Sequence, residues 1–415
     1  MKDQSAAIPG GLKARGMWNK YFILLLFCAL VSTCTGKYYE STMSLHIEAL
    51  NGPAAFTGTL MTGFTIAAAI FRIVGGNLAD RIGRVKVIVI GTILFIVPCV
   101  GMAIFPNSFP MLLVFRIMQG AGFATVGAGY AVAITDVVPG RQMGEGVGYY
   151  ALSSAVASAI GPVIALAVLG SFGFRGVSVT GVATLAASLL ITLVFCRYEA
   201  DKSFYVERDA KEEDTAEDTT VYTGIWKILE KKAVKSAILV FFVMFAGSAI
   251  LSYLTLYAQR SGIGNAALFF TFSAVTMVVV RLVAGKINDK YGVLAAVLPG
   301  CVSYILGYLL LIFAAQYEIL YYVSGVLYGI GNGLVQPALN AESVRGVSAN
   351  RRGAAIATYN LPIEIGISIG SLLWGFMIDN FSFNAVFIWC MVSIGVTMAI
   401  SVVFFAGRKR EKTAA

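Results

Sequence analysis

The feature that most constrains this chain is a series of twelve apolar runs, each long enough to cross a lipid bilayer. A helix needs about 20 predominantly apolar residues to cross the hydrocarbon core. In hydrocarbon every backbone N–H and C=O group must be hydrogen-bonded within the protein, so these runs are expected to be helical. The chain is therefore predicted to be an all-α membrane protein. The predicted spans cover residues 20–44, 57–79, 86–106, 109–135, 145–170, 175–197, 234–259, 266–287, 292–315, 318–341, 352–378 and 383–407.

The composition supports a lipid environment for this chain. Hydrophobic residues make up 58% of it and charged residues only 13%, whereas soluble proteins average about 25% charged. The formal charge of +9 does not indicate nucleic-acid binding, because the bases lie between the apolar runs. The six cysteines are scattered without paired spacing, so we predict no disulfide framework, no metal site and no cofactor.

The distribution of lysine and arginine predicts the orientation in the membrane. Of the 31 basic residues, four lie within spans, and only Arg175 and Arg260 lie in the loops opposite the N-terminus. Cytoplasmic loops carry an excess of lysine and arginine. We therefore expect a multi-pass protein of the cell membrane (plasma or inner membrane) with both termini in the cytoplasm.

An acidic segment divides the chain into two similar halves. The predicted domains are a six-span bundle at 1–197, a cytoplasmic linker at 198–233 and a second six-span bundle at 234–415. A shift of 209 residues, the separation of Arg72 and Arg281, aligns the halves, and repeats of this kind place the substrate site at their interface. The aligned pairs are Arg72 and Arg281, Gly76 and Gly285, Asp80 and Asp289, Gly83 and Gly292, Gly120 and Gly329, Gly122 and Gly331, and Gly161 and Gly370.

The connection between the second and third spans carries the sequence Gly76-Asn-Leu-Ala-Asp80-Arg81-Ile-Gly83-Arg84-Val-Lys86. It closely resembles the signature of the major facilitator superfamily, with Val85 where a base is common. The resemblance implies the major facilitator fold, in which two six-helix bundles are related by a pseudo-two-fold axis. It also implies a latch of the outward-open state, in which the acid binds an arginine and a helix N-terminus near Gly353. The alternative is a purely topological role for the bases. The predicted latch residues are Gly76, Asp80, Arg81, Gly83, Arg84, Arg141 and Asp289.

A second motif, Arg116-Ile-Met-Gln119-Gly120-Ala-Gly122, lies in the fourth span. It resembles the family motif whose buried arginine is linked to proton coupling. A charge at this depth costs roughly 2.5–3.5 kcal/mol on insertion scales, so Arg116 is expected to have a partner. The alternative is a structural ion pair.

A third motif, Gly161-Pro162 in the fifth span, resembles the motif of exporters in the drug–proton antiporter branch, although Ala165-Leu166 replaces the usual closing glycines. Pro162 removes a backbone hydrogen bond, so a helix bend is predicted at this pair. The region from Thr135 to Ser154 is also similar to bacterial efflux members, including opine-metallophore exporters.

Polar side chains inside the spans recur at helical spacing, and a polar face cannot point at lipid. Hydrogen bonding between helices explains the serines but explains Lys37, Glu40 and Glu364 poorly. An acid whose surroundings alternate between apolar and cationic can take up and release a proton in each cycle. We therefore predict Glu364, then Glu40, as proton carriers, together with Arg116. The predicted cavity residues are Lys37, Gln119, Tyr150, Ser154, Ser252, Tyr328, Asn332, Gln336 and Asn360.

These features together predict a monomeric proton-coupled secondary transporter. It would export a small amphipathic or zwitterionic molecule by alternating access, with the proton and the bilayer as its other partners. The chain contains no nucleotide-binding GxxxxGK[ST] loop. Uptake of a small metabolite or organic anion is the alternative within the class, because bases outnumber acids in the spans. An intramembrane enzyme is disfavoured by the single histidine, and a receptor by the lack of an extramembrane domain.

Overall fold

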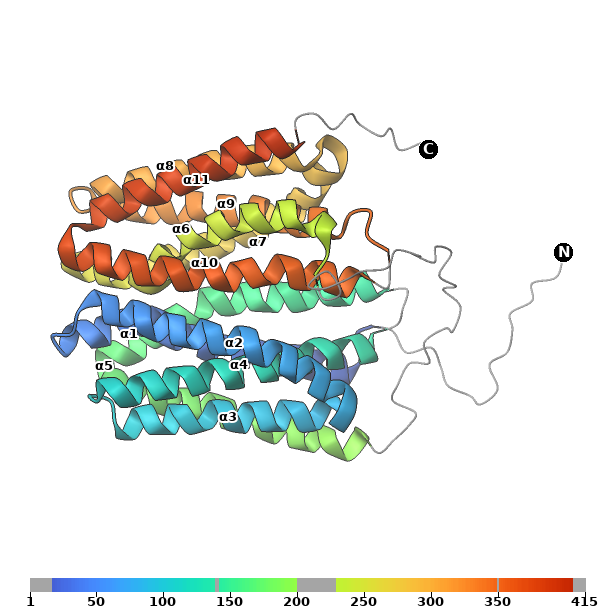
Figure 1. Ribbon diagram of the computed structural model, residues 1–415. Coiled ribbons are helices and arrows are strands. Elements are labelled where there is room, and N and C mark those ends of the chain that lie inside the picture. The colour runs from blue at the N-terminus through green and yellow to red at the C-terminus, as the bar shows by residue number, and fades with distance from the viewer. Residues whose placement is uncertain (1–16, 139–141, 200–228, 349–350, 406–415) are drawn as a thin grey trace.

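The computed structural model describes residues 17–138, 142–199, 229–348 and 351–405, and within these ranges it contains helices and no strand. The helices run side by side along a common direction (Figure 1). They are α1 (Lys20–Ala49), α2 (Ala54–Ile82), α3 (Arg84–Ile104), α4 (Phe109–Val137), α5 (Met143–Glu199), a 3-10 turn η4 (Lys231–Ala233), α6 (Val234–Arg260), α7 (Ala267–Tyr291), α8 (Val293–Ala314), α9 (Glu318–Val344), α10 (Arg352–Asn380) and α11 (Phe383–Phe405).

Helix α5 covers two predicted spans and changes direction between them. Gly173 has φ 64° and ψ −170°, which is non-helical and suits a residue without a side chain. The segments on either side of it both pack on α1, since Gly161 lies beside Lys37 and Gly181 lies beside Tyr39. The second segment therefore returns antiparallel to the first, and the described chain has the twelve helical segments that the sequence predicts.

The outer surface of the bundle is apolar. Leu282 is 72% exposed and Val403 is 80% exposed, and many other large aliphatic side chains point outward in the same way. Ten helices in the described ranges are long and apolar enough to cross a membrane. The chain is thus a multi-pass membrane protein.

Each half of the chain has its own core. One cluster of buried apolar residues runs from Met17 to Leu185 in the first half, and a second lies mainly in α6–α11. Ala54 and Met61 of α2 belong to the second cluster, so α2 joins the halves near its first turns. The predicted linker lies mostly outside the described residues, and the domain division at 198–233 stays a prediction.

The repeat that the sequence shows is present in the packing. A Cβ atom on Gly120 would overlap the carbonyl oxygen of Phe64, and one on Gly329 would overlap that of Ser273, 209 residues after Phe64. Gly83 and Gly292 end α2 and α7 with φ of 95° and 85°. The same helix pairs therefore approach each other closely in both halves, as expected for a duplicated unit.

Candidate transport site

A cavity of about 520 Å³ lies between the two halves. From the first half, α1 contributes Lys37, Glu40 and Ser41, and α5 contributes a row of small and hydroxyl side chains. From the second half, α6, α7, α9 and α10 contribute aromatic, methionine and amide side chains. Of the predicted cavity residues, the structure places Lys37, Tyr150, Ser154, Tyr328, Asn332 and Gln336 on its wall.

Three predicted cavity residues lie elsewhere. Ser252 hydrogen-bonds Ser371 at 2.9 Å and lines a smaller pocket beside the cavity. Gln119 is fully buried in α4, where it accepts from Arg116. Asn360 is on α10 but is not among the residues that line the cavity. Helical spacing predicts which polar side chains share a face of a helix, but which of them reach the cavity depends on the packing of that helix against its neighbours.

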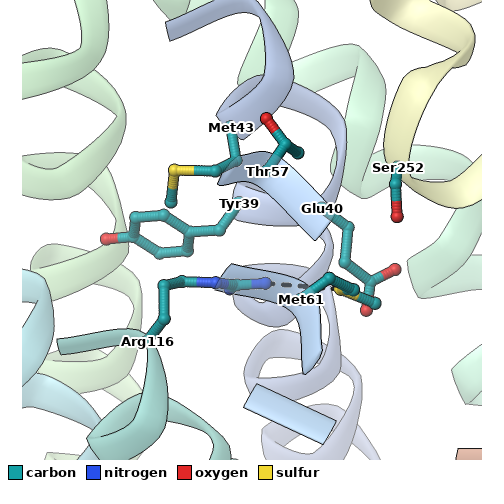
Figure 2. A pocket seen from close by; sticks show the side chains of 7 residues that line it. All are labelled: Tyr39, Glu40, Met43, Thr57, Met61, Arg116 and Ser252. Carbon is teal, nitrogen blue, oxygen red and sulfur yellow. Dashed lines mark hydrogen bonds between the residues drawn. The ribbon is translucent and has the colours of Figure 1, made fainter. Parts of the chain in front are cut away.

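Lys37 and Glu40 form an ion pair on the wall of the cavity, with 2.5 Å between Nζ and Oε2. Both lie on α1, three residues apart, so the helix itself brings them together. Glu40 also lines the smaller pocket with Arg116 and Ser252 (Figure 2). A carboxylate on the cavity wall can exchange a proton with water there.

Arg116 is buried, with 1% of its surface exposed, and its guanidinium points into the smaller pocket towards Met61 (Figure 2). Nη1 donates to Gln119, Nη2 lies 3.5 Å from the Met61 sulfur, and the group sits 4.6 Å from the ring centroid of Phe64. The Nε atom has no hydrogen-bond acceptor. Within the described part of the chain no carboxylate lies within ion-pair distance of Arg116, but Glu40 shares its pocket and interacts with it electrostatically. The role of Arg116 in proton coupling stays a prediction, as does the alternative of a structural ion pair.

Glu364 forms an ion pair that the sequence did not reveal. Its Oε1 lies 2.9 Å from Nη2 of Arg72, which joins α10 to α2 across the two halves. The side chain of Glu364 is 13% exposed and that of Arg72 is 42% exposed. Glu364 is not among the residues that line the cavity, but it interacts electrostatically with Glu40 and Lys37 on the cavity wall, so the two predicted proton carriers belong to one cluster of charges.

A series of contacts joins α2 to α10, and the Arg72–Glu364 pair is one of them. To give their positions, we call the end of the bundle where α1 begins the Lys20 end, and the end where α1 stops the Leu50 end. At the Leu50 end, Asp379 accepts hydrogen bonds from the backbone N–H groups of Ala54 and Ala55, each at 2.8 Å. Further along, Thr62 donates to the carbonyl oxygen of Ser368 at 2.9 Å. These contacts close the α2–α10 junction from the Leu50 end to the middle of the bundle.

Two further contacts join the halves at the Leu50 end. Arg260 of α6 forms a bidentate ion pair with Glu48 of α1, with N–O distances of 2.9 and 2.7 Å. Tyr253 of α6 donates across the halves to the carbonyl oxygen of Ala54 at 3.1 Å, and within its own half to that of Ser371 at 2.6 Å. At the opposite end the cavity wall includes Val147, which lies in the first turns of α5 and is 45% exposed. The cavity is therefore closed at the Leu50 end and extends towards the Lys20 end.

The predicted latch is only partly visible. The side chain of Asp80 and the whole of Arg141 lie outside the described part of the structure, so the latch stays a prediction. Arg84 pairs with Asp136 of α4 at 2.7 Å, within its own half, and Arg81 and Asp289 are exposed. Gly76 lies inside α2, as the predicted span 57–79 implies, and of the two motif glycines only Gly83 has turn geometry.

The Gly161-Pro162 pair lies beside the cavity in the first segment of α5. Pro162 lines the cavity, and Gly161 packs against Cys34 and Lys37 of α1. The residue in α5 with non-helical backbone angles is Gly173, so the bend at Pro162 stays a prediction.

The structure also adds residues to the site. Arg281 of α7 lines the cavity, and Phe269 and Phe270 line it about three turns earlier on the same helix. In the sequence, the feature that pointed to Arg281 was its alignment with Arg72 in the internal repeat. Asp379 gave a weaker signal, an acid at the very end of a span with no base close in sequence. Neither signal says which residues would meet, because that depends on the packing of distant helices.

A profile of the Major Facilitator Superfamily matches residues 25–361. The chain belongs to the major facilitator superfamily. It is 25% identical over 358 residues to the staphylopine export protein of Staphylococcus aureus, covering 83% of this chain and 86% of that protein. It is 24% identical over 368 residues to the class H tetracycline resistance protein of Pasteurella multocida, covering 86% of this chain and 88% of that protein.

Solved structures of major facilitator transporters share the fold. A POT family transporter in complex with 5-aminolevulinic acid aligns with a TM-score of 0.75 at 15% identity, covering 92% of this chain and 95% of that one. A bacterial homologue of the human lysosomal transporter Spinster, inward-facing and unoccupied, aligns with a TM-score of 0.70 at 16% identity, covering 95% and 96%. This major facilitator chain is accordingly a transporter of small molecules and not an enzyme.

Proposed function

We propose that this chain is a proton-coupled exporter of a small amphipathic or zwitterionic molecule in the cell membrane. The observation that carries the proposal is the cavity between the halves, which combines the Lys37–Glu40 ion pair with apolar walls. An amphipathic ligand can bury its apolar part there and keep its charged groups paired. Export agrees with the two curated relatives, whose names describe staphylopine export and tetracycline resistance.

The orientation that the basic residues predict is compatible with export. If both termini are cytoplasmic, the Leu50 end faces outward, and the closed contacts of Asp379, Glu48 and Tyr253 seal the outer side. The cavity then loads from the cytoplasm. Opening the Leu50 end while closing the Lys20 end would release the ligand outside, which is alternating access by rocking of two halves.

Proton coupling is assigned to Glu364, with Glu40 as the second carrier. In the inward-open state Glu364 is paired with Arg72 across the halves, which suits a carboxylate that has released its proton to the cytoplasm. Opening the Leu50 end separates α2 from α10 and removes the cation from Glu364. A carboxylate left there without its cation is costly unless protonated, so it would take up a proton from outside. One proton moving inward supplies about 2.3 kcal/mol per 100 mV of membrane potential.

The test is transport of a compound panel, including staphylopine and tetracycline, into inverted membrane vesicles, with and without an imposed pH gradient. We expect accumulation of at least one compound that requires the gradient and collapses when a protonophore is added. Gradient-independent flux of every compound would contradict proton coupling.

The same assay separates export from uptake of an organic anion, which the two cationic side chains on the cavity wall, Lys37 and Arg281, would also suit. Accumulation in right-side-out vesicles instead of inverted ones would establish uptake and contradict export.

A further inference from the structure

Of the two cationic side chains that line the cavity, Lys37 has a carboxylate partner, and Arg281 has none among the described side chains. Arg281 lines the cavity wall from α7, and its Nε atom is buried without a hydrogen-bond acceptor. No ion pair links it to any acid among the described side chains, whereas Lys37 is paired with Glu40. A buried charge is costly unless it is paired. An anion that enters the cavity would supply that pairing.

The repeat identifies the position in the first half that is equivalent to Glu364, the carboxylate partner of Arg72. The shift of 209 residues that aligns Arg72 with Arg281 also aligns Gly161 with Gly370, and hence Glu364 with Ala155. The packing supports this alignment of α5 with α10, because Gly161 packs tightly on α1 and Gly370 packs in the same way on α6. The partner of Arg72 is Glu364, but the position equivalent to Glu364 beside Arg281 is an alanine.

Ala155 of α5 and Arg281 of α7 line the same cavity, and Ala155 is 4% exposed. The α5–α7 junction thus repeats the α2–α10 junction with the arginine retained and the carboxylate side chain removed. The space that the acid occupies at one junction is part of the ligand cavity at the other.

We propose that a carboxylate of the transported molecule binds Arg281 in this space beside Ala155. The inference rests on the proposed transport function and narrows its substrate class to amphipathic carboxylates. A guanidinium binds a carboxylate through two parallel hydrogen bonds, which fixes the ligand's orientation. Phe269, Phe270 and Met277 supply the apolar wall for the remainder of the molecule.

The test uses the full chain in phosphatidylcholine nanodiscs with two probes of equal shape, 3-phenylpropionate and its neutral amide. A neutral lipid matrix removes anionic headgroups as competing ligands. We expect the wild type to bind the acid at least tenfold more tightly than the amide, since hydrogen bonds to charged groups contribute about 1.5–3 kcal/mol. In Arg281→Gln the preference should vanish because acid affinity falls to that of the amide.

Ala155→Glu tests the equivalence with Glu364 directly. The new carboxylate should bind Arg281, lower acid binding at least tenfold and leave amide binding within a few-fold. Ala155→Gln is the matched control for volume and should keep the preference for the acid. The midpoint temperature of thermal unfolding is a second measurement that needs no ligand. It should be higher for Ala155→Glu than for Ala155→Gln, and this difference should disappear in the Arg281→Gln background.

Equal binding of acid and amide by the wild type, or no binding of either at millimolar concentration, would overturn the inference. So would a preference that survives Arg281→Gln. These outcomes are independent of the vesicle assay. Gradient-driven export without an acid preference would reject the carboxylate site alone, and an acid preference without export would reject the proposed transport direction and coupling.

Discussion

The α2–α10 and α5–α7 junctions are repeats of each other, yet their chemistry differs. In the first, Arg72 is paired with Glu364 at 2.9 Å, and hydrogen bonds continue from this pair to Asp379 at the Leu50 end. In the second, Arg281 lies on the wall of a cavity of about 520 Å³, opposite the small side chains of α5. Duplication supplied an arginine to both junctions, but a protein carboxylate to only one.

This difference indicates that the two junctions have different functions. A pair formed by two side chains of the protein can respond to protonation, because neutralising Glu364 removes its attraction to Arg72. A cation that faces an open cavity can respond only to a ligand. In our proposal the α2–α10 junction responds to protonation and the α5–α7 junction responds to substrate binding. The two responses are coupled because each half of the protein contributes one helix to each junction.

The largest expected effect is that of Glu364→Gln. The amide keeps the shape of the side chain but cannot release a proton, so uphill accumulation in inverted vesicles should fall to the background level. Counterflow exchange without a gradient should persist, since it requires no net proton movement. Glu318→Gln, at the exposed start of α9, is the matched control and should accumulate substrate normally. Normal uphill transport by Glu364→Gln would move the proton site to Glu40.

The second prediction compares the two arginines. Arg72→Gln should change the distribution of conformations with little change in substrate affinity, because Arg72 contacts Glu364 and not the cavity. Arg281→Gln should lower apparent affinity about tenfold or more and leave the conformations unchanged. Spin-label distances across the Leu50 end and substrate titrations measure the two quantities separately. The same response from both variants would mean that the junctions are not specialised.

The third prediction concerns Asp379, which accepts from two backbone N–H groups at the start of α2. Asp379→Asn loses the negative charge at a helix N-terminus and one of the two acceptors, at a cost of about 1–2 kcal/mol. The population open at the Leu50 end should rise about five- to thirtyfold. Double electron–electron resonance between labels at Asn51 and Phe381 would report it. Asn380→Ala should change nothing, because Asn380 donates only within its own helix.

The smallest effect is expected from the Glu48–Arg260 pair, which is more than 30% exposed on both sides. Exposed ion pairs contribute about 0.2–1 kcal/mol, so Glu48→Gln should shift the same equilibrium by about 1.4- to fivefold. At molar salt the difference from wild type should shrink, because the screening length falls to about 3 Å. A salt-independent effect larger than that of Asp379→Asn would show that the closed end depends chiefly on this pair.

The sequence predicted the helices of this chain well because the signals for them are local. An apolar run and the polar residues that interrupt it determine where a span begins, where it ends and which face is polar. All twelve predicted spans start or finish within a few residues of a described helix end. The boundary between the fifth and sixth spans differs from the others because it falls at Gly173, inside helix α5. The repeat was equally accessible, since an identical shift relates Arg72 to Arg281 and Gly120 to Gly329.

By itself, then, the sequence determined the spans, the two related halves and the family. Only the tertiary structure decided which charges meet: Glu364 with Arg72, Asp379 with the start of α2, and Arg281 with none of the described acids. The reason is physical. Helical periodicity is set by neighbours along the chain, but an ion pair between α2 and α10 depends on the rotation, depth and tilt of helices almost 300 residues apart, which packing of the two halves determines.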